Sequence, residues 1–122
     1  MIREFVSTGI FDRQWNELGL SEDDRMELET YLVKNPLAGN VIPGTYGLRK
    51  LRIPLNGKGT RGGGRVIYID FCEHEKLYLM MVYGKNEKTN LTSDEKKRVC
   101  QVIKELEKQL NEISKKDMNK YC

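Results

Sequence analysis

The fold class is decided by the segment 65–83, which reads RVIYIDFCEHEKLYLMMVY. Its two ends, 65–71 and 77–83, are rich in β-branched and aromatic residues, which favour strands. The polar residues 72–76 between them predict a short connection of the hairpin type. The centre of the fold is therefore expected to be an antiparallel strand pair.

Further strands and helices are expected on both sides of this pair. Basic and apolar residues alternate over 48–53, which predicts another strand, and a short first strand is expected over 2–6. Thr8 and Ser21 are candidate caps of two helices, and the capping-box pattern at 92–95 precedes a final amphipathic helix. These elements predict an α+β fold, a small mostly antiparallel β-sheet with helices packed on one face and the other face free.

Length and composition are those of an ordinary globular protein. The chain has 122 residues, of which 39% are hydrophobic and 32% are charged. This size predicts a single domain over 1–122, with 115–122 as a polar, flexible tail. No run reaches the roughly 20 apolar residues that span a membrane, and the first residues do not resemble a secretory leader.

Cysteine and histidine usage narrows the chemistry. The three cysteines are widely spaced and odd in number, so they predict neither a disulfide framework nor a zinc site and favour a reducing cytoplasm. The single histidine, His74, argues against histidine-rich metal sites and against a histidine-based acid and base pair. We therefore expect no metal and no cofactor.

Charge is distributed unevenly along the chain. The net charge is +3, but the 40 residues from Thr30 to Ile69 contain no acid and carry +7, which leaves −4 for the rest. Such segregation predicts one positive surface that attracts polyanions. The basic residues of this segment are Lys34, Arg49, Lys50, Arg52, Lys58, Arg61 and Arg65.

A glycine-rich loop lies in the middle of the basic segment. Residues 57–62 match the dinucleotide-binding pattern G-x-G-x-x-G, but a strand follows where that site requires a helix, so we reject this interpretation. What remains is a loop over 56–64 that carries Lys58 and Arg61. Glycines let backbone amides approach a phosphate closely, and the two cations would neutralise it.

Three stretches follow one another in a defined order: GTYGLRKLR at 44–52, GKGTRGGGRVIY at 57–68 and YGKNE at 83–87. Together they resemble the successive signatures of HigB-type toxins, which belong to the RelE/ParE superfamily of bacterial type II toxin–antitoxin systems. The resemblance extends over most of the chain. It implies a RelE-like domain built of a sheet and helices.

This resemblance also implies an activity and partners. It implies a cytoplasmic, ribosome-dependent endoribonuclease that enters the ribosomal A site, beside the 16S rRNA, and cuts messenger RNA there. It further implies neutralisation by a cognate helix-turn-helix antitoxin, through which alone the toxin would reach operator DNA. No membrane association is implied.

The resemblance assigns roles by position. Lys50 and Arg52 resemble the basic pair on the family's central strand, and Arg65 resembles the arginine that grips the scissile phosphate. Tyr83 and Lys85 stand where the family places residues near the cleavage point. These five residues are the expected catalytic set. Expected to bind RNA and its phosphates are Arg49, Lys58, Arg61 and Asn86.

The expected reaction uses the nucleophile that RNA itself supplies. Attack of the 2′-hydroxyl on the adjacent phosphate needs no metal and gives a 2′,3′-cyclic phosphate and a 5′-hydroxyl. Arg65 and Arg61 would stabilise the charge that develops on the phosphate. A lysine crowded by other cations loses its proton more readily, so Lys50 or Lys85 is a candidate base. Tyr83 would stack on or orient a nucleobase, or serve as the acid.

Two positions depart from the pattern of some relatives. Arg52 stands where they have a second lysine, and an arginine is a poor general base. Asn86 stands where they have an arginine. Acid and base roles therefore do not transfer directly from those members.

Two other functions remain open from the sequence. One is a ParE-like toxin that binds DNA gyrase and cuts no RNA, although the basic residues expected on the sheet argue against it. The other is an RNA-binding module without chemistry. Assays of DNA supercoiling and of new RNA ends separate the three possibilities.

Overall fold

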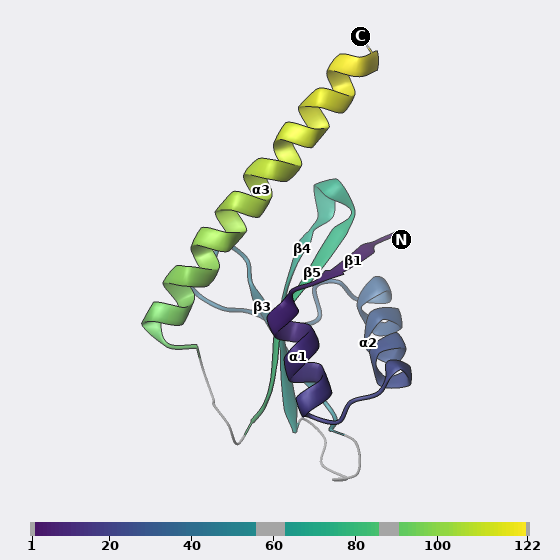
Figure 1. The fold of residues 1–122 in the computed structure, drawn as a ribbon, viewed down its shortest axis with the longest axis vertical. Coiled ribbons are helices and arrows are strands. Elements are labelled where there is room, and N and C mark those ends of the chain that lie inside the picture. The colour runs from purple at the N-terminus through teal and green to yellow at the C-terminus, as the bar shows by residue number, and fades with distance from the viewer. Residues whose placement is uncertain (1, 56–62, 86–90, 122) are drawn as a thin grey trace.

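The described part of the chain forms one sheet and three helices, shown in Figure 1. The structure, a computed structural model, describes residues 2–55, 63–85 and 91–121, with side chains up to residue 113. The elements are β1 (Glu4–Ser7), α1 (Gly9–Glu17), α2 (Glu22–Lys34), β2 (Asn40–Val41), β3 (Arg49–Ile53), β4 (Gly64–Phe71), the 3-10 turn η1 (Cys72–His74), β5 (Lys76–Gly84) and α3 (Ser93–Tyr121).

The sheet is mixed but mostly antiparallel. Its strand order is β1-β5-β4-β3-β2, and β1 runs parallel to β5 while the other neighbours are antiparallel. The α+β class and the central antiparallel pair that the sequence predicts are thus confirmed. The long strands begin and end within two residues of their predicted bounds.

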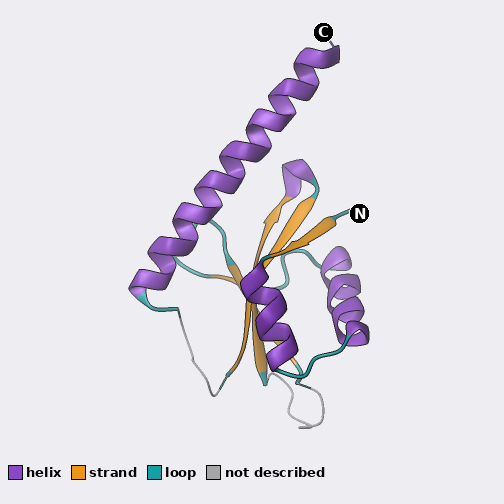
Figure 2. Ribbon diagram, in the orientation of Figure 1, coloured by secondary structure: helices purple, strands orange, loops and turns teal. Residues whose placement is uncertain are grey.

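Helices cover both faces of the sheet, which corrects the expectation that all helices pack on one face. Figure 2 shows the strands between α3 on one side and α1 and α2 on the other. Phe11 of α1 and Leu32 of α2 pack with Val66 on one face, whereas Ile103 of α3 packs with Ile67 on the other.

The reason lies in β4, whose residues 66–69 are all buried. A strand that alternates apolar and polar residues exposes one face to solvent. This run of four apolar residues must instead be buried on both faces of the sheet. The apolar stripe of α3 supplies that cover on the second face. The free sheet surface is consequently smaller than expected.

Local sequence signals set the ends of the helices. Thr8 caps α1, because its Oγ1 accepts a hydrogen bond from the backbone N–H of Phe11 at 3.0 Å. Ser21 and Asp24 form a capping box at the start of α2, and Thr92 and Glu95 form another before α3. All three caps were predicted from the sequence.

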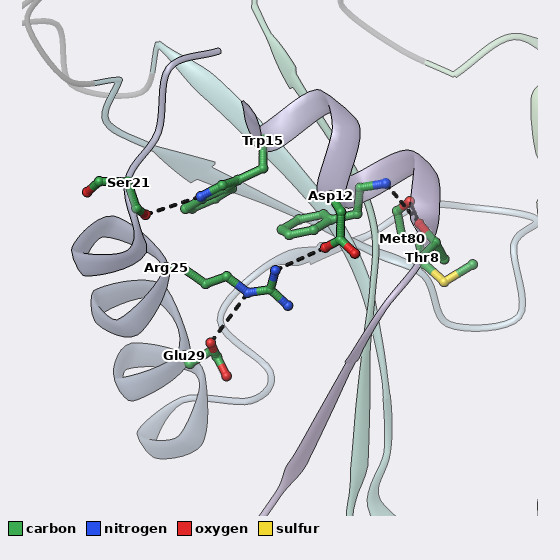
Figure 3. A network of polar contacts seen from close by, with 8 residues as sticks. Thr8, Asp12, Trp15, Ser21, Arg25, Glu29 and Met80 are labelled. Carbon is green, nitrogen blue, oxygen red and sulfur yellow. Dashed lines mark hydrogen bonds and ion pairs between the residues drawn. The ribbon is translucent and has the colours of Figure 1, made fainter. Parts of the chain in front are cut away.

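Polar contacts join α1 to α2 on the face of the sheet opposite α3. Figure 3 shows Arg25 between Asp12 and Glu29, at nitrogen–oxygen distances of 3.0 and 3.5 Å. The indole Nε1 of Trp15 donates to the carbonyl of Ser21 at 3.2 Å. These contacts hold the helix pair together over the apolar core.

The helix α3 is long. Its backbone continues to Tyr121 and so includes most of the segment 115–122, for which the sequence predicts a flexible polar tail. Neither glycine nor proline interrupts residues 93–121, which explains why the helix does not end earlier. No helix in the described residues is both long enough and apolar enough to cross a membrane.

Candidate nucleic-acid interface

Three neighbouring strands bring four of the predicted catalytic residues onto one face of the sheet. Arg65 of β4 lies opposite Arg52 of β3 and opposite Tyr83 of β5. Residues directly opposite in antiparallel strands share a face, with Cβ atoms about 4.5–5.5 Å apart. Lys50 shares this face because it lies two residues from Arg52 along β3. We call Lys50, Arg52, Arg65 and Tyr83 the basic cluster.

The fifth predicted catalytic residue, Lys85, lies at the end of β5. Its backbone N–H donates to the carbonyl of Gly63 at 2.9 Å, next to the pair formed by Gly64 and Gly84. Its side chain is exposed. Lys85 therefore borders the same end of the sheet as Arg65.

A β-bulge in β5 puts Tyr83 on this face. Ile67 pairs with Met81 and Tyr68 pairs with Leu79, so Met80 is an extra residue. Leu79 packs on the side of α1 and α2, and without the bulge Tyr83, four residues on, would face the same side. One inserted residue reverses the alternation, and Tyr83 instead packs with the residues beneath α3.

Helix α1 stabilises the backbone of the bulge. The Oγ1 of Thr8 donates to the carbonyl of Met80 at 2.7 Å, and the N–H of Val82 donates to Oε1 of Gln14 at 2.9 Å. Figure 3 shows the contact between Thr8 and Met80. Because β1 ends at Ser7, these side chains satisfy backbone groups of β5 that β1 no longer pairs. They fix the direction in which Tyr83 leaves the strand.

The environment of Tyr83 keeps its phenol protonated. Only 2% of this residue is exposed, and burial raises the pKa of its phenol. The positive charge of Arg65 opposes this shift, whereas Glu95 in the first turn of α3 adds to it. A neutral phenol beside an arginine can donate a hydrogen bond or a proton near neutral pH.

A cavity of about 270 Å³ adjoins the basic cluster. Lys50 and Tyr83 line it from the sheet, and Lys96 lines it from the first turn of α3. The two lysines give it a positive charge that suits a phosphate or another anion. In the part of the chain that the structure describes, no three His, Cys, Asp or Glu side chains are grouped so that they could hold a metal ion.

The structure does not bring Arg49 to this surface. Arg49 lies opposite Tyr68, which packs on the side of α1 and α2, and its Nη1 donates to the carbonyls of Leu37 and Gly39 at 3.2 and 2.7 Å. These hydrogen bonds therefore stabilise the segment that precedes β2. The other three predicted phosphate-binding residues, Lys58, Arg61 and Asn86, lie outside the described residues.

Three residues near the basic cluster were not predicted from the sequence. Glu95 and Lys96 come from α3, and Asn40 comes from β2, where it lies opposite Lys50. Asn40 belongs to the acid-free segment, but a lone asparagine carries no signal of its own. The position of α3 over the sheet could not be read from the capping box that the sequence shows at its start.

Arg52 and Arg65 are like charges placed directly opposite each other, an arrangement that costs stability. We expect Arg52→Gln to raise the free energy of unfolding by about 0.5 kcal/mol and to lower activity on RNA. Urea denaturation in low and high salt measures the first effect, which salt should reduce because Arg52 is exposed. Arg52→Lys is the matched control that keeps the charge. A less stable Arg52→Gln protein would contradict this account.

The fold and the site together define a class of protein: α+β domains that carry basic side chains and a protonated tyrosine on one face of the sheet. The family described as "RelE toxin of RelE / RelB toxin-antitoxin system" matches residues 33–122. The protein therefore belongs to the RelE family of toxins. Among solved structures, a mutant of E. coli toxin RelE in the free state aligns with 72% of this chain and 88% of its own, at 19% identity and a TM-score of 0.48.

Proposed function

We propose that this protein is a HigB-like toxin that cuts messenger RNA on the ribosome and so inhibits translation. The observation that supports the proposal most is the basic cluster, in which Arg52, Arg65 and Tyr83 form one row across three strands. Family membership supplies the context of a toxin–antitoxin system. The sheet face supplies positive charge and a protonated group at one place.

The basic cluster suits cleavage by the RNA's own 2′-hydroxyl. Its oxygen forms a bond to phosphorus while the bond from phosphorus to the 5′-oxygen breaks. Arg65 stabilises the negative charge that develops on the phosphate oxygens, as fixed donors do in other transition states. The products are a 2′,3′-cyclic phosphate and a 5′-hydroxyl.

Two protons move during this step. The proton of the 2′-hydroxyl passes to a base, for which the candidates are Lys50 within the cluster and Lys85 at its border. The 5′-oxygen takes a proton from an acid. Tyr83 is the candidate acid, because its phenol is protonated and its side chain lines the adjoining cavity. The guanidinium of Arg52 is already protonated and cannot act as the base, so Arg52 instead binds the RNA backbone.

The proposed partners follow from the family. A cognate antitoxin neutralises the toxin, and we propose that it is a helix-turn-helix protein that carries the pair to operator DNA. The ribosomal A site, with its 16S rRNA, would hold the message against the basic cluster. The proposed place of action is the cytoplasm.

A translation extract tests the proposed function. The purified protein should stop translation and leave new 5′-hydroxyl ends on ribosome-bound message, which primer extension maps. A module that only binds RNA would leave no new ends. A ParE-like toxin would instead inhibit supercoiling of plasmid DNA by gyrase while translation continued. Either of those two results would overturn the proposal.

A further inference from the structure

The cavity beside the basic cluster has walls of two kinds. Apolar side chains from the segment after β2 and from the segment before α3 form one part of its lining, and polar side chains form the rest. Its volume of about 270 Å³ is close to the lower end of small-molecule sites, about 300 Å³. Its lining residues are Asn40, Val41, Ile42, Pro43, Lys50, Tyr83, Leu91 and Lys96.

The segment after β2, which forms one side of the cavity, is held in place by contacts with Leu48 and with α3. The N–H of Ile42 donates to the carbonyl of Leu48 at 2.8 Å. Farther along this segment, the thiol of Cys100 in α3 donates to the carbonyl of Gly44 at 3.2 Å, and the Lys104 ammonium lies 4.8 Å from the centre of the Tyr46 ring. These contacts tie the segment to α3, so the cavity is largely formed before any ligand enters.

Asn40 contributes an amide to the rim of this cavity. It lies opposite Lys50 in the antiparallel pair of β2 and β3, so the two residues share the face that carries Arg65 and Tyr83. The side chain of Asn40 is exposed. A primary amide has two donors and an acceptor in one plane, which matches the edge of a nucleobase.

We propose that this cavity holds one unstacked nucleobase of the bound RNA and that Asn40 reads its edge. The apolar residues contact the plane of the base, while Lys96 contacts a phosphate of the same nucleotide. This inference rests on the proposed function, because it identifies a subsite for the RNA that the basic cluster cleaves. It makes Asn40 a specificity-determining residue beside the scissile phosphate.

A message library randomised at the codon in the ribosomal A site tests this inference. Sequencing of the new 5′ ends gives the base preference at each position next to the cut for the wild-type protein and for Asn40→Ala and Asn40→Asp. A lost pair of hydrogen bonds is worth roughly tenfold in discrimination. We therefore expect Asn40→Ala to reduce the preference at one position about tenfold, and Asn40→Asp, which only accepts hydrogen bonds, to shift it toward bases with an amino group.

Two control variants separate reading of the base from other effects. Asn16→Ala removes an exposed asparagine of α1 on the opposite face and should keep the wild-type preference. Lys96→Ala should lower cleavage at limiting protein without changing which base is preferred. Wild-type preference in both Asn40 variants, or equal cutting of all sequences by the wild-type protein, would overturn the inference while the proposed function stands. Absence of new ends with the wild-type protein would instead overturn the proposed function itself.

Discussion

Arg65→Ala should reduce the rate of RNA cleavage about 100- to 1,000-fold, the loss found when one fixed donor to a developing negative charge is removed. Arg65 is the residue at the centre of the basic cluster, with Arg52 on one side and Tyr83 on the other. Its guanidinium can present two parallel N–H groups to two phosphate oxygens. The cleavage rate in a translation extract, with protein in excess over ribosomes, is the measurement.

The control for this prediction is Arg13→Ala, which removes an exposed arginine of α1 and should cut at the wild-type rate. Arg65→Lys keeps the charge but loses the two parallel donors, so it should be intermediate. Thermal melts establish that each variant is folded. If Arg65→Ala cleaves as fast as the wild-type protein, Arg65 does not stabilise the transition state and the role of the basic cluster is wrong.

Much of the fold could be predicted because its signals are local. The caps at Thr8, Ser21 and Thr92 each depend on residues within one turn, and all three are present. The strands likewise follow from residue type over a few positions. The alternation of residues along β3 also predicts that Lys50 and Arg52 share a face, as the register shows.

The same alternation predicts that Arg49 does not lie on the positive surface, although the net charge of the segment includes it. Neighbouring residues of a strand point to opposite faces, so Arg49 and Lys50 could not both belong to one surface. The structure places Arg49 on the side of α1 and α2, where it donates to backbone carbonyls. Net charge over a segment predicts that a positive surface exists, but the period of the strand decides which residues form it.

The sheet face on which Tyr83 lies depends on residues that are far from it in the sequence. Strict alternation from Leu79 predicts the wrong face, and the bulge at Met80 is stabilised by Thr8 and Gln14, which are about 70 residues distant. The side on which α3 packs is also set by tertiary contacts, between Ile103 and the sheet. Local propensity carries no signal for either feature.

Phe11→Ala should lower the free energy of unfolding by about 3–5 kcal/mol, the usual cost of removing a buried aromatic ring. Phe11 is completely buried, its ring centre lies 5.5 Å from that of Trp15, and the guanidinium carbon of Arg25 lies 5.4 Å from its centre. The midpoint of thermal unfolding should fall by more than about 10 °C. Ile10→Ala, at a half-exposed position of the same helix, should change it little.

The Phe11 variant also separates stability from chemistry. Phe11 lies on the face opposite the basic cluster, so Phe11→Ala protein that is still folded at low temperature should cleave RNA as long as α1 holds the bulge. Arg65→Ala should show the reverse, a normal melt and little cleavage. A Phe11→Ala protein that melts like the wild type would show that α1 is not part of the cooperative core. A well-folded one without cleavage would show that α1 positions Tyr83 more sensitively than its hydrogen bonds to Met80 and Val82 suggest.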